Sequence, residues 1–185
     1  MAANTKPISI SPIRISRKHV LWFGESTLPP AVMAPLKPLH LRSAGISEVV
    51  YPYSHDRVPD KHHLLFYPVQ GKFSVRLRSK TIPLLPGTVA FMPAGSRFTR
   101  KLVGKTGIHL YFQFRTRKRW DKLASAGAIF RKTNSSDLLH MVLRYFLQAT
   151  VYGEGEDILA ATDYAEMLSR LMLRDMGGTS RSTEQ

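Results

Sequence analysis

The stretch GIHLYFQFRTR, residues 107–117, carries the side chains with the most recognisable chemistry. Polar and apolar residues alternate in it. In a β-strand, His109, Tyr111 and Gln113 would therefore share one face, and the apolar residues between them would share the other. An imidazole, a phenol and a carboxamide in an otherwise apolar cup are typical of a pocket that binds a small molecule. The alternative is that these side chains fill the interior, with their polar tips hydrogen-bonded to neighbours.

The remaining reactive residues argue against several classes of enzyme. The chain has no cysteine, and therefore no thiolate metal site, cysteine nucleophile or disulfide. It also lacks a glycine-rich phosphate loop, a nucleophile elbow and a His-Glu-x-x-His zinc motif. His62 and His63 are adjacent, so a strand would point them to opposite faces, and we expect them to cap a strand start. Asp56 and Asp60 are the only carboxylates of residues 49–120 and leave little for paired acid–base catalysis.

The composition describes a basic chain with enough apolar residues for one core. Of its 185 residues 43% are hydrophobic, and 27 Lys and Arg against 13 Asp and Glu give a formal charge of +14. This excess favours nucleic acid, an anionic membrane face or anionic small ligands, although a basic protein without such partners would have it too. The N-terminus has no secretory signal, and no stretch approaches the ~18 apolar residues of a membrane span. We expect a cytoplasmic protein.

Two regions of the chain are predicted to surround the candidate pocket, an N-terminal arm and a β-barrel or sandwich. Residues 1–45 are basic and then rich in proline, which predicts an N-terminal arm and lead-in. Residues 46–120 hold six short strand-like stretches bounded by turn residues, a pattern typical of a small barrel or sandwich. The stretches are ISEVVYPY, HHLLFYPVQG, KFSVRLRS, TIPLLPG, TVAFMPAG and GIHLYFQFRTR.

In residues 121–185 the period changes from 2 to 3.6 residues, which predicts two helices and a polar tail. DLLHMVLRYFLQAT begins near Asp137, and DILAATDYAEMLSRLMLRDM ends before Gly177. The second helix carries a heptad-like stripe, which marks either intrachain core or the interface of a homodimer. Its members are Ile158, Ala161, Ala165, Leu168 and Met172.

Residues 84–101, LLPGTVAFMPAGSRFTRK, resemble the second motif of cupins, in which a glycine precedes a Pro-x-Gly turn and then a histidine. Gly87, Pro93 and Gly95 match this motif, but Phe98 stands at the histidine position. The other cupin metal ligands, two histidines one residue apart and a nearby carboxylate, are absent as well. The resemblance implies a mainly β fold with a small cupin-type (jelly-roll) barrel, which the two helices predicted above would follow as an antiparallel pair. Because the metal ligands are missing, we expect this barrel to hold no metal or other cofactor.

The wider window, about residues 40–176, resembles the N-terminal regulatory cupin domain of AraC-type transcription factors. The resemblance implies that the barrel binds an effector, that an arm folds over it and that the helix pair forms a dimer contact. It also assigns Arg57 and Arg100 to the ligand, together with His109 and Tyr111 of the alternating strand. The full set of expected ligand-binding residues is Arg57, Arg100, His109, Tyr111, Gln113 and, on the arm, Trp22.

We therefore expect an effector-sensing and dimerisation domain of a transcription regulator, not an enzyme. Its expected partners are a sugar or small anionic compound, a second copy of the chain and, through a domain beyond Gln185, DNA. The polar tail would then be a linker to that DNA-binding domain. One alternative is a standalone cupin enzyme of the sugar epimerase or isomerase type, with His55, Asp56 and Tyr111 as acid and base. A further alternative is a ligand-free dimerisation module, whose barrel would be filled by its own side chains.

Overall fold

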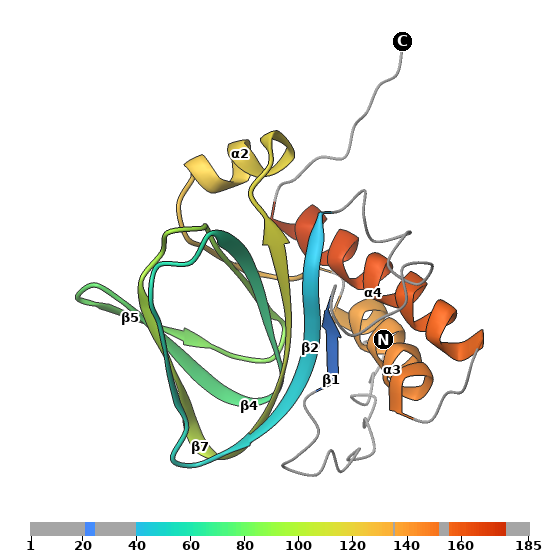
Figure 1. Ribbon diagram of the computed structural model, residues 1–185. Coiled ribbons are helices and arrows are strands. Elements are labelled where there is room, and N and C mark those ends of the chain that lie inside the picture. Colours follow the sequence, from blue (N-terminus) through green and yellow to red (C-terminus); the bar gives the residue numbers. More distant parts are fainter. Residues whose placement is uncertain (1–20, 25–39, 135, 152–155, 177–185) are drawn as a thin grey trace, which may run out of the picture.

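The computed structural model of the protein describes residues 21–24, 40–134, 136–151 and 156–176 (Figure 1). Most of the predicted arm and the polar tail lie outside these residues. The described strands are β1 (Leu21–Gly24), β2 (Leu41–Val50), β3 (Ser54–Arg57), β4 (His62–Leu77), β5 (Lys80–Leu84), β6 (Thr88–Met92), β7 (Phe98–Arg115) and β8 (Ile129–Lys132). The described helices are α2 (Lys118–Ser125), α3 (Ser136–Val151) and α4 (Glu156–Asp175).

All strand pairs in the structure are antiparallel, and the fold is mainly β. The sheet runs in the order β1-β2-β7-β4-β6-β8, with β3 paired to β7 and β5 paired to β4. The long strand β7 is central to the sheet, because β2, β3 and β4 all pair with it. Figure 1 shows that the sheet curls round on itself, and we call it the rolled sheet.

The long strands bend where their pairing is interrupted. The register between β4 and β7 shifts twice, between Pro68 and Gln70 and between Gln70 and Lys72. Gly71 lies at this bend with φ +80°, and a β-carbon there would be only 2.6 Å from the carbonyl oxygen of Thr106. Only glycine fits such a close approach of two backbones in a left-handed conformation. This bend lets one strand serve two parts of the rolled sheet.

Alternating residues of the rolled sheet enter two different apolar clusters. The inner cluster lies on the concave face and includes Phe66, Phe73 and Tyr111. The outer cluster lies between the sheet and the helices and includes Phe112 and side chains of α3 and α4. The alternation read from residues 107–117 is therefore real, because the polar face and the apolar face of β7 separate as predicted.

The described part of the predicted helix stripe is buried within the chain. Ala165, Leu168 and Met172 are each 0% exposed and belong to the outer cluster beneath the helices. These three side chains are therefore intrachain core and not a free surface for a second copy. The side chains of Ile158 and Ala161 lie outside what the structure describes.

Four elements, β2, β8, β4 and α2, differ from the sequence-based expectation. β2 begins at Leu41, inside the predicted arm, and β8 follows residue 120 and pairs with β6, so the rolled sheet crosses both predicted boundaries. Two predicted strands form the single strand β4, because Gly71 bends the chain without ending its pairing. The short helix α2 was not expected. Within the described residues, no helix is long and apolar enough to cross a membrane.

Candidate functional site

A cavity of about 910 Å³ opens on the concave side of the rolled sheet. Five of the six expected ligand-binding residues line it, namely Arg57, Arg100, His109, Tyr111 and Gln113. The sixth, Trp22, lies on β1 as the register partner of Gly45, and its side chain is outside what the structure describes. The other lining residues are Ser47, Glu48, Val49, Tyr53, His55, Asp56, Val58, Pro59, Asp60, Lys61 and Leu64. A volume of this size is within the range of pockets for small molecules.

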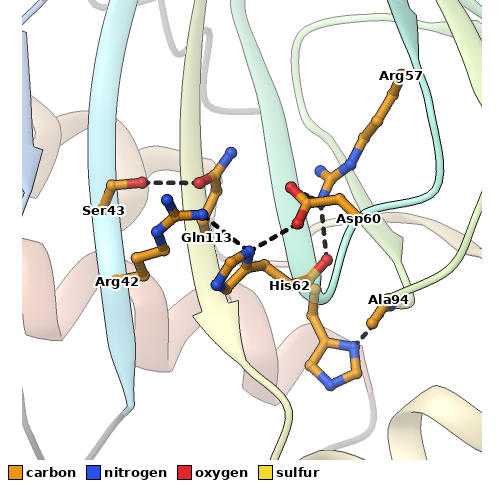
Figure 2. Close-up of polar contacts among 8 residues, drawn as sticks. Arg42, Ser43, Arg57, Asp60, His62, Ala94 and Gln113 are labelled. Atoms are coloured by element: carbon orange, nitrogen blue, oxygen red, sulfur yellow. Dashed lines mark hydrogen bonds and ion pairs between the residues drawn. The ribbon is translucent and has the colours of Figure 1, made fainter.

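The side chains of His109, Tyr111 and Gln113 on β7 line the cavity, and β7 pairs there with the neighbouring strand β2. Gln113 pairs in register with Ser43, whose hydroxyl donates a hydrogen bond of 3.1 Å to the Gln113 amide oxygen (Figure 2). Tyr111 pairs with Gly45, and its ring lies across that glycine. Burial raises the pKa of Tyr111 to about 12, so the phenol is neutral at physiological pH and can donate a hydrogen bond.

Arg57 is held in a local network at the start of β4. Its Nη2 donates to the carbonyl oxygen of His62 at 2.7 Å and lies 3.2 Å from Oδ2 of Asp60 (Figure 2). The other carboxylate oxygen of Asp60 lies 2.7 Å from Nδ1 of His62. Although burial by itself raises the pKa of Asp60, the His62 hydrogen bond and the Arg57 charge outweigh it and lower that pKa. The charge of Arg57 is therefore compensated by the chain itself.

Arg100 is as buried as Arg57 but has no acidic partner among the described residues. Its Nη2 donates a 2.6 Å hydrogen bond to the Tyr53 hydroxyl, and its guanidinium carbon lies 4.2 Å from the centre of the Phe66 ring. Its Nε is buried without any hydrogen-bond partner in the described structure. Burial lowers the pKa of Arg100, although a guanidinium group stays protonated at physiological pH.

His109 lies deep in the cavity, 2% exposed, among aromatic rings. Its ring centre is 4.9 Å from that of Phe66 and 5.5 Å from that of Phe73. Burial, followed by the charge of Arg100, lowers the pKa of His109 well below its usual value. The imidazole is therefore neutral, and its buried Nδ1 lacks a hydrogen-bond partner among the described residues. The imidazole therefore adds no charge to the cavity wall.

Two lining residues, Tyr53 and His55, were not among the expected ligand-binding residues, and His55 entered only the epimerase alternative. His55 pairs in register with Arg100, and burial together with the Arg100 charge lowers the pKa of His55. The sequence does contain a pattern that predicts them. Tyr53, His55 and Arg57 occur at every second position and would share one face of a strand, as His109, Tyr111 and Gln113 do. The short strand β3 obscured it, since only four residues pair.

His62 and His63 each have a local role at the start of β4, where they were expected to cap the strand. His62 contacts Asp60, while His63 Nδ1 accepts a 3.0 Å hydrogen bond from the Ala94 backbone N–H and its ring stacks on Phe91 at 5.5 Å. Among the described residues, no three His, Asp or Glu side chains gather as a metal site would require. The chemistry that the cavity residues offer is hydrogen bonding, stacking and positive charge.

Comparisons with known proteins add little to this geometry. No protein-family model matches the chain, and no curated protein does. Among solved structures, it is similar to the EutQ protein of Clostridium difficile, with 15% identity over 40% of this chain and 56% of that one, at a TM-score of 0.35. The cupin domain of Schizosaccharomyces pombe Cnp3 gives 20% identity, 43% and 57% coverage and a TM-score of 0.38.

A third structure, described as a predicted oxalate decarboxylase from Thermotoga maritima, gives 14% identity, 44% and 72% coverage and a TM-score of 0.40. The chain thus spans only 56% of the EutQ protein and 57% of the Cnp3 domain. At these TM-scores, none of the three similarities carries an argument about fold or function.

Proposed function

We propose that this protein is a cupin-type domain that binds a small molecule in the cavity of the rolled sheet and transmits its presence to a partner. The observation that carries this proposal is the cavity of about 910 Å³ with two buried arginines, Arg57 and Arg100, on its wall. Buried charged groups beside an accessible cavity are expensive for the free protein and are typical of binding sites. A barrel filled by its own side chains, as the ligand-free module requires, would not leave this volume.

The finer part of the proposal is that the domain is the effector sensor of an AraC-type transcription regulator. It is supported by the motif resemblance and by the order of the elements, in which helices α3 and α4 follow the rolled sheet. The helices and the cavity share strand β7, whose alternate residues face each way. A ligand that biases this strand could therefore change how the helices pack, which is population shift between two arrangements. The +14 charge would favour nearby DNA.

Dimerisation through the helix pair is part of this proposal, but through other side chains than the predicted stripe. Leu138, Met141 and Tyr145 occur at i, i+3 and i+7 on α3 and are 38%, 49% and 48% exposed. Such spacing places them along one side of the helix. We expect Met141→Glu to yield a folded monomer by sedimentation, and a dimer that persists would exclude this face.

An enzyme remains the competing proposal. His55, Asp56 and Tyr111 all line the cavity, which is where the epimerase alternative needs its acid and base. However, His55 and Asp56 are adjacent in β3, and the structure gives no hydrogen bond between their side chains. Turnover of a cavity ligand would establish the enzyme, whereas reversible binding without turnover supports a sensor.

Val49→Trp is the variant that tests the binding proposal, because it fills the cavity wall without changing any charge. The matched control is Val103→Trp on β7, where the side chain is 52% exposed and does not line the cavity. Thermal-shift screening of sugars, sugar acids and aromatic acids should find ligands that stabilise the wild type and the control but not Val49→Trp. A ligand that stabilises Val49→Trp as much as the wild type would count against a binding cavity, and so would a screen that finds no stabilising ligand.

A further inference from the structure

The two buried arginines of the cavity differ in how their charges are compensated. Arg57 has Asp60 at 3.2 Å and the carbonyl oxygen of His62 at 2.7 Å. Among the described residues, the contacts of Arg100, which is 6% exposed, are the hydroxyl and ring of Tyr53 and the face of the Phe66 ring. No carboxylate of the described residues lies within ion-pair distance of Arg100. The buried wall of the cavity therefore has one positive charge that the described chain does not neutralise.

Such a charge is costly in the free protein. Taking a guanidinium group out of water is strongly unfavourable unless anionic partners compensate for it. A hydrogen bond to a phenol and a cation–π contact offset only part of this cost. Two acidic residues of the same cavity wall, Glu48 and Asp56, do not form an ion pair with Arg100 in the described structure. Asp56 is exposed and Glu48 is only half-buried, so water solvates both instead.

We propose that the ligand of this cavity is a small monocarboxylate whose anionic group binds to the guanidinium group of Arg100. This inference rests on the proposed binding function and selects one ligand class within it. A carboxylate compensates the buried charge and accepts two N–H groups of one guanidinium, which is the strongest geometry available to such a pair. A neutral sugar would add hydroxyl contacts but would leave the charge uncompensated.

The rest of the cavity suits the body of such an acid. Two neutral polar side chains, the imidazole of His109 and the phenol of Tyr111, line the same cavity as Arg100 and add no charge that would repel the carboxylate. Apolar side chains and the Tyr53 ring provide the remaining contact surface. The apolar lining residues are Val49, Val58, Pro59 and Leu64. An aromatic or short aliphatic acid therefore fits better than a dicarboxylate, whose second charge would meet Glu48 or Asp56.

Matched ligand pairs isolate the charge of the ligand. The probes are benzoate, para-hydroxybenzoate, hexanoate and glucuronate, each compared with its neutral counterpart benzamide, para-hydroxybenzamide, hexanamide or glucose. Isothermal titration should give binding for at least one acid that is about tenfold or more tighter than for its neutral partner. That acid should lose its binding to Val49→Trp, which places it in the cavity.

Arg100→Met tests the residue, with Arg76→Met as a control that removes the same charge from an exposed position of β4. Arg100→Met should abolish the preference for the acid, and Arg100→Lys should retain part of it because the charge remains. Without ligand, Arg100→Met should also raise the thermal midpoint by about 2–4 °C, because it removes an uncompensated buried charge. The last readout needs no ligand.

The outcomes separate this inference from the proposed function. If neutral ligands bind in the cavity as tightly as the acids and ignore Arg100→Met, the cavity is a binding site and the carboxylate inference is wrong. If acids bind but ignore Val49→Trp, both are wrong. If Arg100→Met lowers the midpoint of the ligand-free protein, the guanidinium group is a structural element and the uncompensated charge is not the reason for its position.

Discussion

The ring of Tyr111 lies against the backbone of Gly45, so that a β-carbon on Gly45 would be only 2.5 Å from the Tyr111 hydroxyl oxygen. The two residues are register partners on β7 and β2, and Tyr111 borders the cavity. Gly45 therefore provides the space in which this wall of the cavity is formed.

Gly45→Ala should displace the Tyr111 ring and disturb the cavity. We expect a cost in stability of about 1–3 kcal/mol, as for other overpacked positions. We also expect a fall of about tenfold in the affinity of any cavity ligand, which corresponds to about 1.4 kcal/mol. Urea unfolding and titration calorimetry measure the two effects. In a Tyr111→Ala background the stability cost should largely vanish, and an equal cost in both backgrounds would show that the clash is not with the ring.

Asp60→Asn should destabilise the protein through Arg57. The substitution leaves a guanidinium group that is 8% exposed without its carboxylate, and loss of such a partner typically costs about 1–3 kcal/mol. The side chain of Asp60 is itself 30% exposed, which places the expected cost in the lower part of this range. Asp56→Asn, an exposed acid on the adjacent strand, is the control. Equal urea midpoints for the two variants would contradict the role given to Asp60.

Stability should fall as the pH drops below about 6.5, because three histidines have lowered pKa values in the folded state. Burial lowers the pKa of His55, His63 and, most strongly, His109, whereas in the unfolded chain each titrates near 6.5. Above that pH the three histidines are neutral in both the folded and the unfolded chain, and they cost the native state no stability. Below it, the unfolded chain gains protons that the native state excludes, so unfolding becomes easier.

The measurement is the urea midpoint between about pH 8 and pH 5. His109→Gln should reduce the slope of stability against pH by up to one proton, about 1.4 kcal/mol per pH unit. The pKa of Asp60 is lowered from 3.8, so its stabilisation of the native state is complete above that pH and is lost only as the pH falls below it. An unchanged slope in His109→Gln would mean that His109 takes up its proton in the folded state as readily as in the unfolded chain.

Leu168→Ala should strongly destabilise the chain whether or not it dimerises. Leu168 is 0% exposed in the outer cluster, and truncating a buried leucine costs about 2–5 kcal/mol. Its neighbour Met167 is 48% exposed, so Met167→Ala should stay within about 0.5 kcal/mol of the wild type. Urea unfolding of the two variants compares them directly. If Leu168→Ala instead altered only the oligomeric state, the helix stripe would be an interface after all.

The strand-like stretches could be predicted because their side-chain period is local information. Alternation alone identified the shared face of His109, Tyr111 and Gln113, and the structure brings all three to the cavity. The heptad-like stripe was equally visible on α4. A stripe shows only that a helix face is buried, however, and Ala165, Leu168 and Met172 are buried in the chain's own outer cluster.

The charge relationships of the cavity could not be predicted, because they depend on pairings distant in sequence. Arg100 meets Tyr53 only because β3 pairs with β7, and nothing local to either residue specifies that pairing. The same holds for Tyr111 and Gly45, which are 66 positions apart in the printed sequence (111 minus 45). Arg57 and Asp60 are close in sequence, but the loop that turns one toward the other has no periodic signal.

The most direct measurement of the central claim is the ¹⁵N-resolved N–H signal of the Arg100 side chain during titration with the carboxylates and their neutral counterparts. The signal can be assigned by its absence in Arg100→Lys. The account predicts that it shifts on saturation with a binding carboxylate and does not shift with the matching neutral compound, while the exposed Arg76 signal stays in place. An acid that binds in the cavity and leaves the Arg100 signal unmoved would contradict it.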